Sequence, residues 1–190
     1  MAAEKPGVTR NIVIYGPPLA GKTTLLRAYA RSRGLAVEET IQPWSGMNSF
    51  RVARVRDVQR GLELVTLPGT TWTKDMWWPF LVKMAGLAIV LDSEEHREKM
   101  DRVYVDALLT RTLTVDACCT IWTKRDLLAT ATATAGAGAT ASAGKPTALA
   151  LESDPRLAPL PRFETRHDEP DAHQLALTWL TGQVTAVTPT

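Results

Sequence analysis

The sequence has little of what would tie a protein to an oxidising compartment, a membrane or a polyanion. Its two cysteines, Cys118 and Cys119, are adjacent in an apolar run, so we expect reduced, buried strand residues and a cytoplasmic location. The 22 basic and 20 acidic residues give a formal net charge of +2, which predicts no general attraction to nucleic acid. Neither end has a long apolar stretch or a lipidation signal, so we expect no direct membrane anchor.

The chain does have enough apolar material for one compact domain. It has 190 residues, of which 45% are hydrophobic, and we expect a single domain over 1–190. Residues 129–146 are a low-complexity run of alanine, threonine and glycine. Because small residues cannot offset the entropy of ordering, we expect a flexible surface loop there; a frayed helix is the alternative, which the glycines disfavour.

Strand and helix patterns alternate along the chain, which predicts an α/β fold with helices on both faces of a mostly parallel, six-stranded sheet. The second and third strands are separated by only 57–61, which predicts a hairpin and one antiparallel edge strand. The predicted strands are 10–15, 49–56, 62–67, 86–91, 116–122 and 160–165, and the predicted helices are 22–32, 75–84, 94–111 and 170–181.

Residues 16–24 read GPPLAGKTT and match the phosphate-binding pattern G-x-x-x-x-G-K-[ST] between a strand pattern and a helix pattern. That context matters because backbone N–H groups and a helix N-terminus hold phosphate oxygens. Lys22 adds a positive charge, and the Thr23 hydroxyl is placed to ligate a Mg²⁺ that bridges the phosphates. We therefore predict a nucleotide-binding loop with the contact residues Leu19, Ala20, Gly21, Lys22, Thr23 and Thr24.

Residues 123–126 read TKRD directly after an apolar strand pattern. Here the chain resembles the Ras-like small GTPases, whose motif is Asn-Lys-x-Asp. The resemblance implies that Asp126 accepts hydrogen bonds from guanine N1–H and N2–H₂ and that the Lys124 stem stacks on the base. A carboxylate suits guanine and disfavours adenine, which has an acceptor at N1. A solvated charge pair at a strand end is the alternative interpretation.

Residues 64–70 read LVTLPGT, where the general Ras-like pattern is Asp-x-x-Gly-Gln. The Thr-x-Pro-Gly combination is similar to the bacterial MglA-type GTPases of cell polarity and gliding motility, as are the Gly-Pro opening of the loop and the Lys-Arg-Asp-Leu run. This resemblance implies a Ras-like P-loop fold that binds GTP or GDP with Mg²⁺, and a roadblock-type, MglB-like regulator. It also implies that Gly69 donates its N–H to the γ-phosphate and His167 its N–H to guanine. We expect Asp92 to cap a helix.

Several positions depart from that family. Thr70 replaces the glutamine that positions the attacking water, Pro18 crowds the γ-phosphate region, and Thr66 replaces the aspartate. Thr40 and Ser45 are the candidates for the metal-binding threonine that precedes the second strand pattern, and neither has a clear sequence context. We therefore expect weak intrinsic hydrolysis.

Three tryptophans, Trp72, Trp77 and Trp78, follow Gly69 and form either a partner-binding surface, which Trp44 joins, or part of the core. Trp122 and Trp179 are expected in the core. The expected function is a nucleotide-dependent molecular switch. The alternatives are a pseudo-GTPase that holds nucleotide statically or not at all, and a P-loop ATPase or kinase, which Lys124 and Asp126 disfavour.

Overall fold

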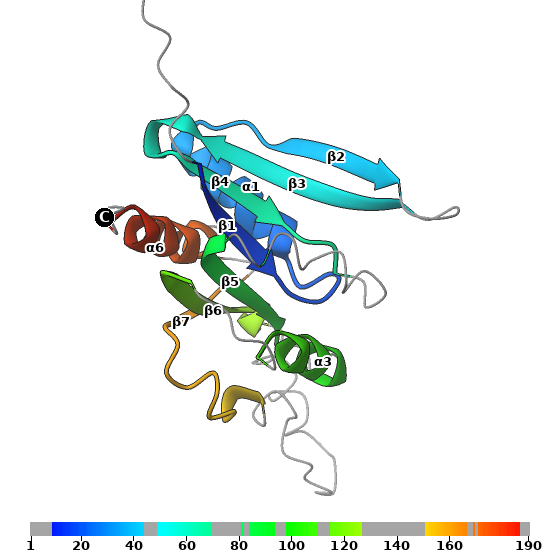
Figure 1. Cartoon of the computed structure of the whole chain (residues 1–190). Helices are drawn as coiled ribbons and strands as arrows, with labels where there is room; N and C mark the ends of the chain where they lie inside the picture. The colour runs from blue at the N-terminus through cyan, green and yellow to red at the C-terminus, as the bar shows by residue number, and fades with distance from the viewer. Residues whose placement is uncertain are drawn as a thin grey trace, which may run out of the picture.

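The computed structural model describes residues 9–43, 49–69, 81, 84–93, 98–109, 115–126, 151–166, 169 and 171–186. Strands and helices alternate through these residues (Figure 1). The strands are β1 (Arg10–Tyr15), β2 (Glu38–Pro43), β3 (Ser49–Asp57), β4 (Leu62–Thr66), β5 (Met84–Asp92), β6 (Ala117–Thr123) and β7 (Arg162–Glu164). The helical elements are α1 (Lys22–Arg33), the 3₁₀ turn η1 (Val58–Arg60), α3 (Glu98–Leu109) and α6 (Ala172–Ala186).

The strands form one sheet in the order β2-β3-β4-β1-β5-β6-β7. β1 pairs in parallel with β4 and β5, and parallel pairing continues through β6 to β7. β3 runs antiparallel to both of its neighbours, β2 and β4. The predicted α/β fold with an antiparallel edge is confirmed, but the described residues form a sheet of seven strands rather than six. The prediction missed β2, whose Glu-Glu-Thr-Ile-Gln-Pro sequence lacks apolar alternation.

The hairpin predicted around 57–61 joins β3 to β4. The Asp57 carboxylate accepts a hydrogen bond from the backbone N–H of Arg60, which holds the η1 turn. Gly61 then adopts a left-handed conformation with φ 62°, which glycine takes at little cost, and β4 begins at the next residue. Side-chain capping and one glycine therefore set the register of this antiparallel pair.

The sheet is covered on both faces, as β1 illustrates. Ile12 and Ile14 belong to one buried cluster and Val13 and Tyr15 to the other, because successive strand residues point to opposite faces. Helices α1 and α6 pack together and fill the first cluster, whereas α3 contributes to the second (Figure 1). Both layers hold β1 rigidly at the centre, and the phosphate-binding motif follows its C-terminal end.

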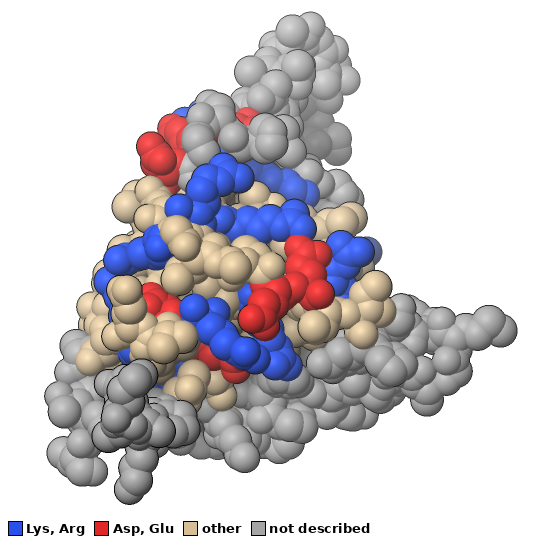
Figure 2. Space-filling view, turned by 90° about the horizontal axis from the view of Figure 1, so that it is seen from above, with Lys and Arg blue, Asp and Glu red and all other residues tan. Residues whose placement is uncertain are grey.

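The edge formed by β2 and β3 carries charges of both signs. Glu39 pairs with Arg27 and Arg51, and Arg56 lies 3.8 Å from Glu38. Figure 2 views this side of the molecule and shows acidic side chains interleaved with basic ones. Interleaved charge on an edge strand discourages the addition of a further strand.

Some predicted boundaries need correction. Met84 lies in β5 rather than in a helix, β7 is shorter than its predicted span, and α6 continues five residues beyond the predicted end at 181. The rest of the 75–84 helix, apart from Leu81, and the 129–146 segment lie outside the described residues.

Candidate functional site

The 16–24 loop lies between β1 and the first turn of α1, as the motif requires. Within the described residues, no side chain caps the start of α1 and its first turn contains no acidic residue. Lys22 is 8% exposed, and its ammonium group donates hydrogen bonds to the carbonyl oxygens of Gly16 at 2.9 Å and Pro17 at 2.5 Å. A helix N-terminus of this kind, beside a buried ammonium group, favours an anion.

The backbone of the loop is tightly constrained. Gly16 has φ 155°, and a Cβ there would lie 2.1 Å from the Val90 carbonyl oxygen. Gly21 has φ 85°, and Leu19 has φ 63° with 78% of its surface exposed. Because a left-handed conformation is unfavourable for leucine, the surrounding loop must impose it. The Leu19 side chain points to solvent, so any contribution of this residue to a phosphate site comes from its backbone.

Gly69 lies against this loop. A Cβ at Gly69 would come within 2.3 Å of the Pro18 nitrogen and 2.5 Å of the Pro17 carbonyl carbon. Only glycine allows the 67–69 segment to approach the phosphate loop this closely. The structure therefore brings together two elements that the sequence assigned to one site.

Thr123, which stands where Ras-like small GTPases have asparagine, contacts two other segments of the site. Its hydroxyl lies 3.1 Å from the carbonyl oxygen of Ala20 and 3.0 Å from that of Leu91. A hydroxyl has one proton, so it donates to one of these carbonyls at a time. The phosphate loop is thus linked to the ends of β5 and β6 by a side chain whose role the sequence did not indicate.

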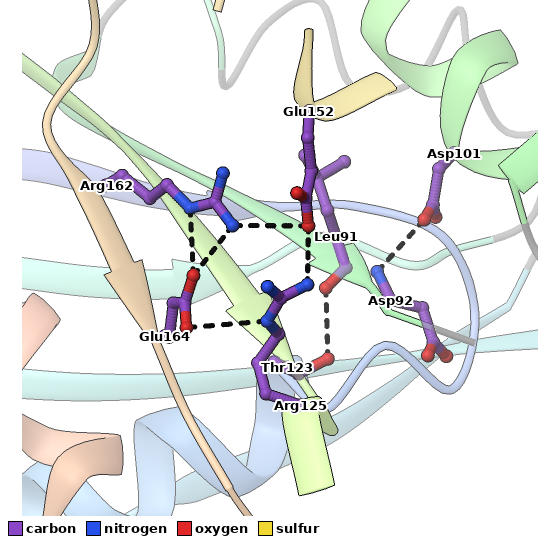
Figure 3. A network of polar contacts seen from close by, with 8 residues as sticks. All are labelled: Leu91, Asp92, Asp101, Thr123, Arg125, Glu152, Arg162 and Glu164. Carbon is purple, nitrogen blue, oxygen red and sulfur yellow. Dashed lines mark hydrogen bonds and ion pairs between the residues drawn. The ribbon is translucent and has the colours of Figure 1, made fainter. Parts of the chain in front are cut away.

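Lys124 contacts a residue for which we expected another role. Its ammonium group lies 2.8 Å from the carboxylate of Asp92, whose side chain is fully buried. The Asp92 backbone N–H donates to the Asp101 carboxylate at 3.0 Å (Figure 3). Asp92 therefore ends β5 and pairs with Lys124. The residues that directly follow Ser93, where we expected Asp92 to cap a helix, lie outside the described part of the chain.

The 123–126 loop is also held by backbone hydrogen bonds. The Arg125 N–H donates to the Thr165 carbonyl at 3.2 Å, and the Thr165 N–H donates to the Trp122 carbonyl at 2.8 Å. Lys124 has φ 59°, a second left-handed residue that is not glycine. Asp126 is half-buried two residues further on. The end of β6 and the residue after β7 thus form one connected unit.

The residues at the positions where Ras-like small GTPases bind a metal ion differ from the Ras-like pattern. The Thr66 hydroxyl accepts from the Ala53 N–H at 3.1 Å and lies 3.3 Å from the Ala53 carbonyl, so β3 engages it. Thr40 lies in β2 opposite Val52. Among the described residues, no three histidine, cysteine or acidic side chains gather to hold a metal ion. Thr23, the predicted metal ligand, is half-buried in the first turn of α1, directly after Lys22.

The cysteines lie in β6 as expected. Burial raises the pKa of the Cys118 thiol to about 12 and raises the pKa of the Cys119 thiol as well. Both thiols are therefore protonated at neutral pH, so neither is poised to act as a nucleophile.

Trp122 is 2% exposed in the core, as predicted, and Trp179 packs on Phe163 with ring centroids 5.5 Å apart. Other predicted residues lie outside the described part of the chain, namely Thr70, His167, Ser45, Trp44, Trp72, Trp77 and Trp78. Among the described helices, none is long and apolar enough to cross a membrane.

No protein-family model matches this sequence. No curated protein matches it either. The structure, however, is similar to the crystal structure of an ADP-ribosylation-factor-like GTP-binding protein from Encephalitozoon cuniculi, described as the small COPII coat GTPase SAR1 in complex with GDP. The match has a TM-score of 0.59 at 17% identity and covers 95% of this chain and 82% of that one. The chain has the small GTPase fold.

Proposed function

We propose that the chain binds GDP and GTP and acts as a nucleotide-dependent molecular switch with weak intrinsic hydrolysis. The observation that carries this proposal is the convergence at one edge of the sheet of the phosphate loop, Gly69 and the 123–126 loop. Convergence of segments this far apart in sequence is what a bound nucleotide requires, because its phosphates and base must be held at the same time.

The phosphate half of the proposal rests on backbone geometry. The uncapped start of α1 and the Lys22 ammonium group would contact the β- and γ-phosphates. Gly69 lies close enough to the loop for its N–H to donate to a γ-phosphate. When present, Mg²⁺ would neutralise phosphate charge, and Thr23 would be its protein ligand.

The base half rests on Lys124 and Asp126. Asp126 would accept the two guanine N–H groups, and the Lys124 stem would stack on the ring while Asp92 holds its ammonium group. His167 would donate its backbone N–H to the guanine oxygen. The fold neighbour was crystallised with GDP, which supports the choice of a guanine nucleotide.

Weak hydrolysis is expected because the side chains that would position water and metal are replaced. Thr70 is too short to position the attacking water, Pro18 crowds the γ-phosphate, and the Thr66 hydroxyl is engaged by β3. A static nucleotide-holding module is the second candidate function. It is favoured by Thr66, which stands where the general Ras-like pattern has an aspartate. The Thr66 hydroxyl contacts the Ala53 backbone instead of being available to a metal ion.

The motifs at 16–17, 66–69 and 124–127 favour an MglA-type protein within the Ras-like superfamily. On that assignment the partner would be a roadblock-type, MglB-like regulator that contacts the segment from Trp72 to Trp78 in the cytoplasm. Exposed tryptophans are suited to such contacts because they bury a large area on binding. Capture of such a regulator in the presence of GTP but not of GDP would support the finer assignment.

The decisive test of the function is calorimetric titration of the purified chain with GDP, GTP and ATP, with and without Mg²⁺. We expect guanine nucleotides to bind at least tenfold more tightly than ATP. Asp126→Asn should weaken GDP binding by about 10- to 100-fold, since a hydrogen bond to a charged group contributes about 1.5–3 kcal/mol. The same variant should improve binding of xanthosine diphosphate, because an amide donates to the carbonyl that replaces the amine. Equal affinities for GDP and ATP would contradict the proposal.

A further inference from the structure

Four charged side chains form a closed cluster beside the 123–126 loop, namely Arg125, Glu152, Arg162 and Glu164 (Figure 3). We call this cluster the base-loop clamp. The Arg125 guanidinium hydrogen-bonds Glu152 and lies 3.4 Å from the Glu164 carboxylate. Arg162 lies 3.2 Å from Glu152 and 2.7 Å from Glu164. Each arginine therefore contacts both glutamates, and charges alternate around the cluster.

The most buried contact of the clamp joins Arg125 to Glu152, whose side chains are 19% and 12% exposed. Ion pairs on an open surface contribute little because water and salt screen them, whereas a partly buried charge-assisted hydrogen bond is screened less. Arg162 adds a stacking contact, since its guanidinium carbon lies 4.9 Å from the centroid of the Trp122 ring. The clamp is thus fixed to the core beneath it.

The position of Arg125 gives the clamp its importance. Arg125 lies between Lys124 and Asp126, the two residues proposed to read the base. Its backbone N–H is bonded to Thr165, which precedes the proposed guanine-contacting segment. Lys124 holds a left-handed conformation at φ 59°, which it would not keep without restraint from its neighbours. Anchoring Arg125 at both its backbone and its guanidinium supplies that restraint.

Glu152 comes from a part of the chain that the family motifs do not include. It lies in the 151–160 segment, where Leu151 is 1% and Leu157 5% exposed in the second core cluster. The Asp154 carboxylate accepts hydrogen bonds from the backbone and side chain of Arg156 and holds the turn. Glu152 is therefore presented to Arg125 from a firm support.

We propose that Glu152 is a positioning residue that slows nucleotide release by holding Arg125, and through it Lys124 and Asp126, in the base-recognition geometry. This inference rests on the proposed function. Because the clamp positions the two residues proposed to read the base, loosening it should shorten the time for which guanine is held.

The test uses the full chain loaded with GDP that carries a fluorescent N-methylanthraniloyl label, chased with unlabelled GDP. We expect Glu152→Gln to raise the dissociation rate by about 5- to 20-fold. This increase is smaller than the one expected when a fully buried charge pair is broken, because the pair is only partly buried. The affinity for GDP should fall as the dissociation rate rises, whereas the affinity for ATP, which Asp126 does not favour, should change less. Glu63→Gln is the matched control, because Glu63 is 21% exposed and also faces two arginines, Arg54 and Arg56, on β3.

A merely structural role predicts a different result. If Glu152 only stabilises the fold, Glu152→Gln and Glu63→Gln should both lower the melting temperature. The two variants should then release GDP at the same rate. Arg125→Gln provides a second variant. Since Arg125 and Glu152 act as one unit, the double variant should release GDP no faster than Arg125→Gln alone. Additive acceleration, or a rate in Glu152→Gln equal to wild type, would overturn the inference.

The outcomes also separate this inference from the proposed function. A wild-type chain that takes up no labelled GDP, with or without Mg²⁺, refutes guanine-nucleotide binding itself. A wild-type chain that binds GDP and releases it at the same rate as folded Glu152→Gln refutes the clamp alone. Circular dichroism at the assay temperature establishes that each variant is folded.

Discussion

The neighbouring strands β1 and β4 run in parallel to the same edge of the sheet, with Ile14 opposite Thr66, yet they end in unlike ways. β1 leads into a loop that buries Lys22 and constrains its backbone through glycines. β4 ends in Thr66, whose hydroxyl is engaged by β3. If the proposed function is right, phosphate binding would depend on backbone shape, which the fold preserves. Metal and water positioning would depend on single side chains, which substitution can remove without altering the sheet.

The largest effect is expected from the β1 side. Lys22→Ala should weaken GTP binding by about 2–4 kcal/mol, roughly 30- to 900-fold, because the phosphate charge would lose its buried partner. Calorimetric titration measures this loss. The control is Lys99→Ala on α3, an exposed lysine of the same size, which should bind GTP like wild type. A Lys22→Ala chain that is unstable but binds GTP normally would assign Lys22 a structural role.

The β4 side should show its effect in stability instead. Thr66→Asp puts back the carboxylate of the general Ras-like pattern, but Thr66 is 3% exposed and bonded to Ala53. We expect the free energy of unfolding to fall by about 1–3 kcal/mol, because a buried charge replaces a satisfied hydroxyl. Urea denaturation measures the change. Thr66→Val, which removes only the hydroxyl, should be the less damaging variant, and the reverse order would contradict this reading of β4.

The smallest effect concerns the link between the two halves of the site. Thr123→Val removes the hydroxyl that lies near the Ala20 and Leu91 carbonyls, and we expect GDP affinity to fall by about 1 kcal/mol, roughly fivefold. Thr120→Val is the matched control on the same strand, because the Thr120 hydroxyl contacts the Pro161 carbonyl at 3.4 Å, on the β7 side. Equal GDP affinities in the two variants would show that Thr123 does not support the phosphate loop.

Local signals predicted the centre of the fold well. The apolar pattern of β1 and the glycine-lysine spacing at 16–24 encode a strand, a loop and a helix within about twenty residues, and the structure has all three. The β3–β4 hairpin followed from the short 57–61 connection. These features depend on contacts between residues that are close in sequence, so a pattern of residues is sufficient to indicate them.

Features that depend on distant contacts were missed. β2 contains two glutamates and a proline, so its own sequence does not indicate a strand. It is a strand because it pairs along its length with β3, from Glu38 opposite Arg54 to Pro43 opposite Ser49. The contact between Asp92 and Lys124 spans 32 residues. Glu152 lies beside the 123–126 loop because of how the 151–160 segment packs, and no local sequence pattern predicts that packing.

The packing of α6 on α1 has a consequence for how the molecule assembles. The Arg10 side chain at the start of β1 donates to the carbonyl of Val184, 174 residues along the chain. Leu177, Leu180 and Val184 fill the same cluster as the buried residues of α1. During synthesis, the part of this sheet face that α6 covers therefore stays exposed until α6, the last described helix, has emerged. Closing contacts of such long sequence separation is slow, and the exposed apolar face is open to misassembly in that interval.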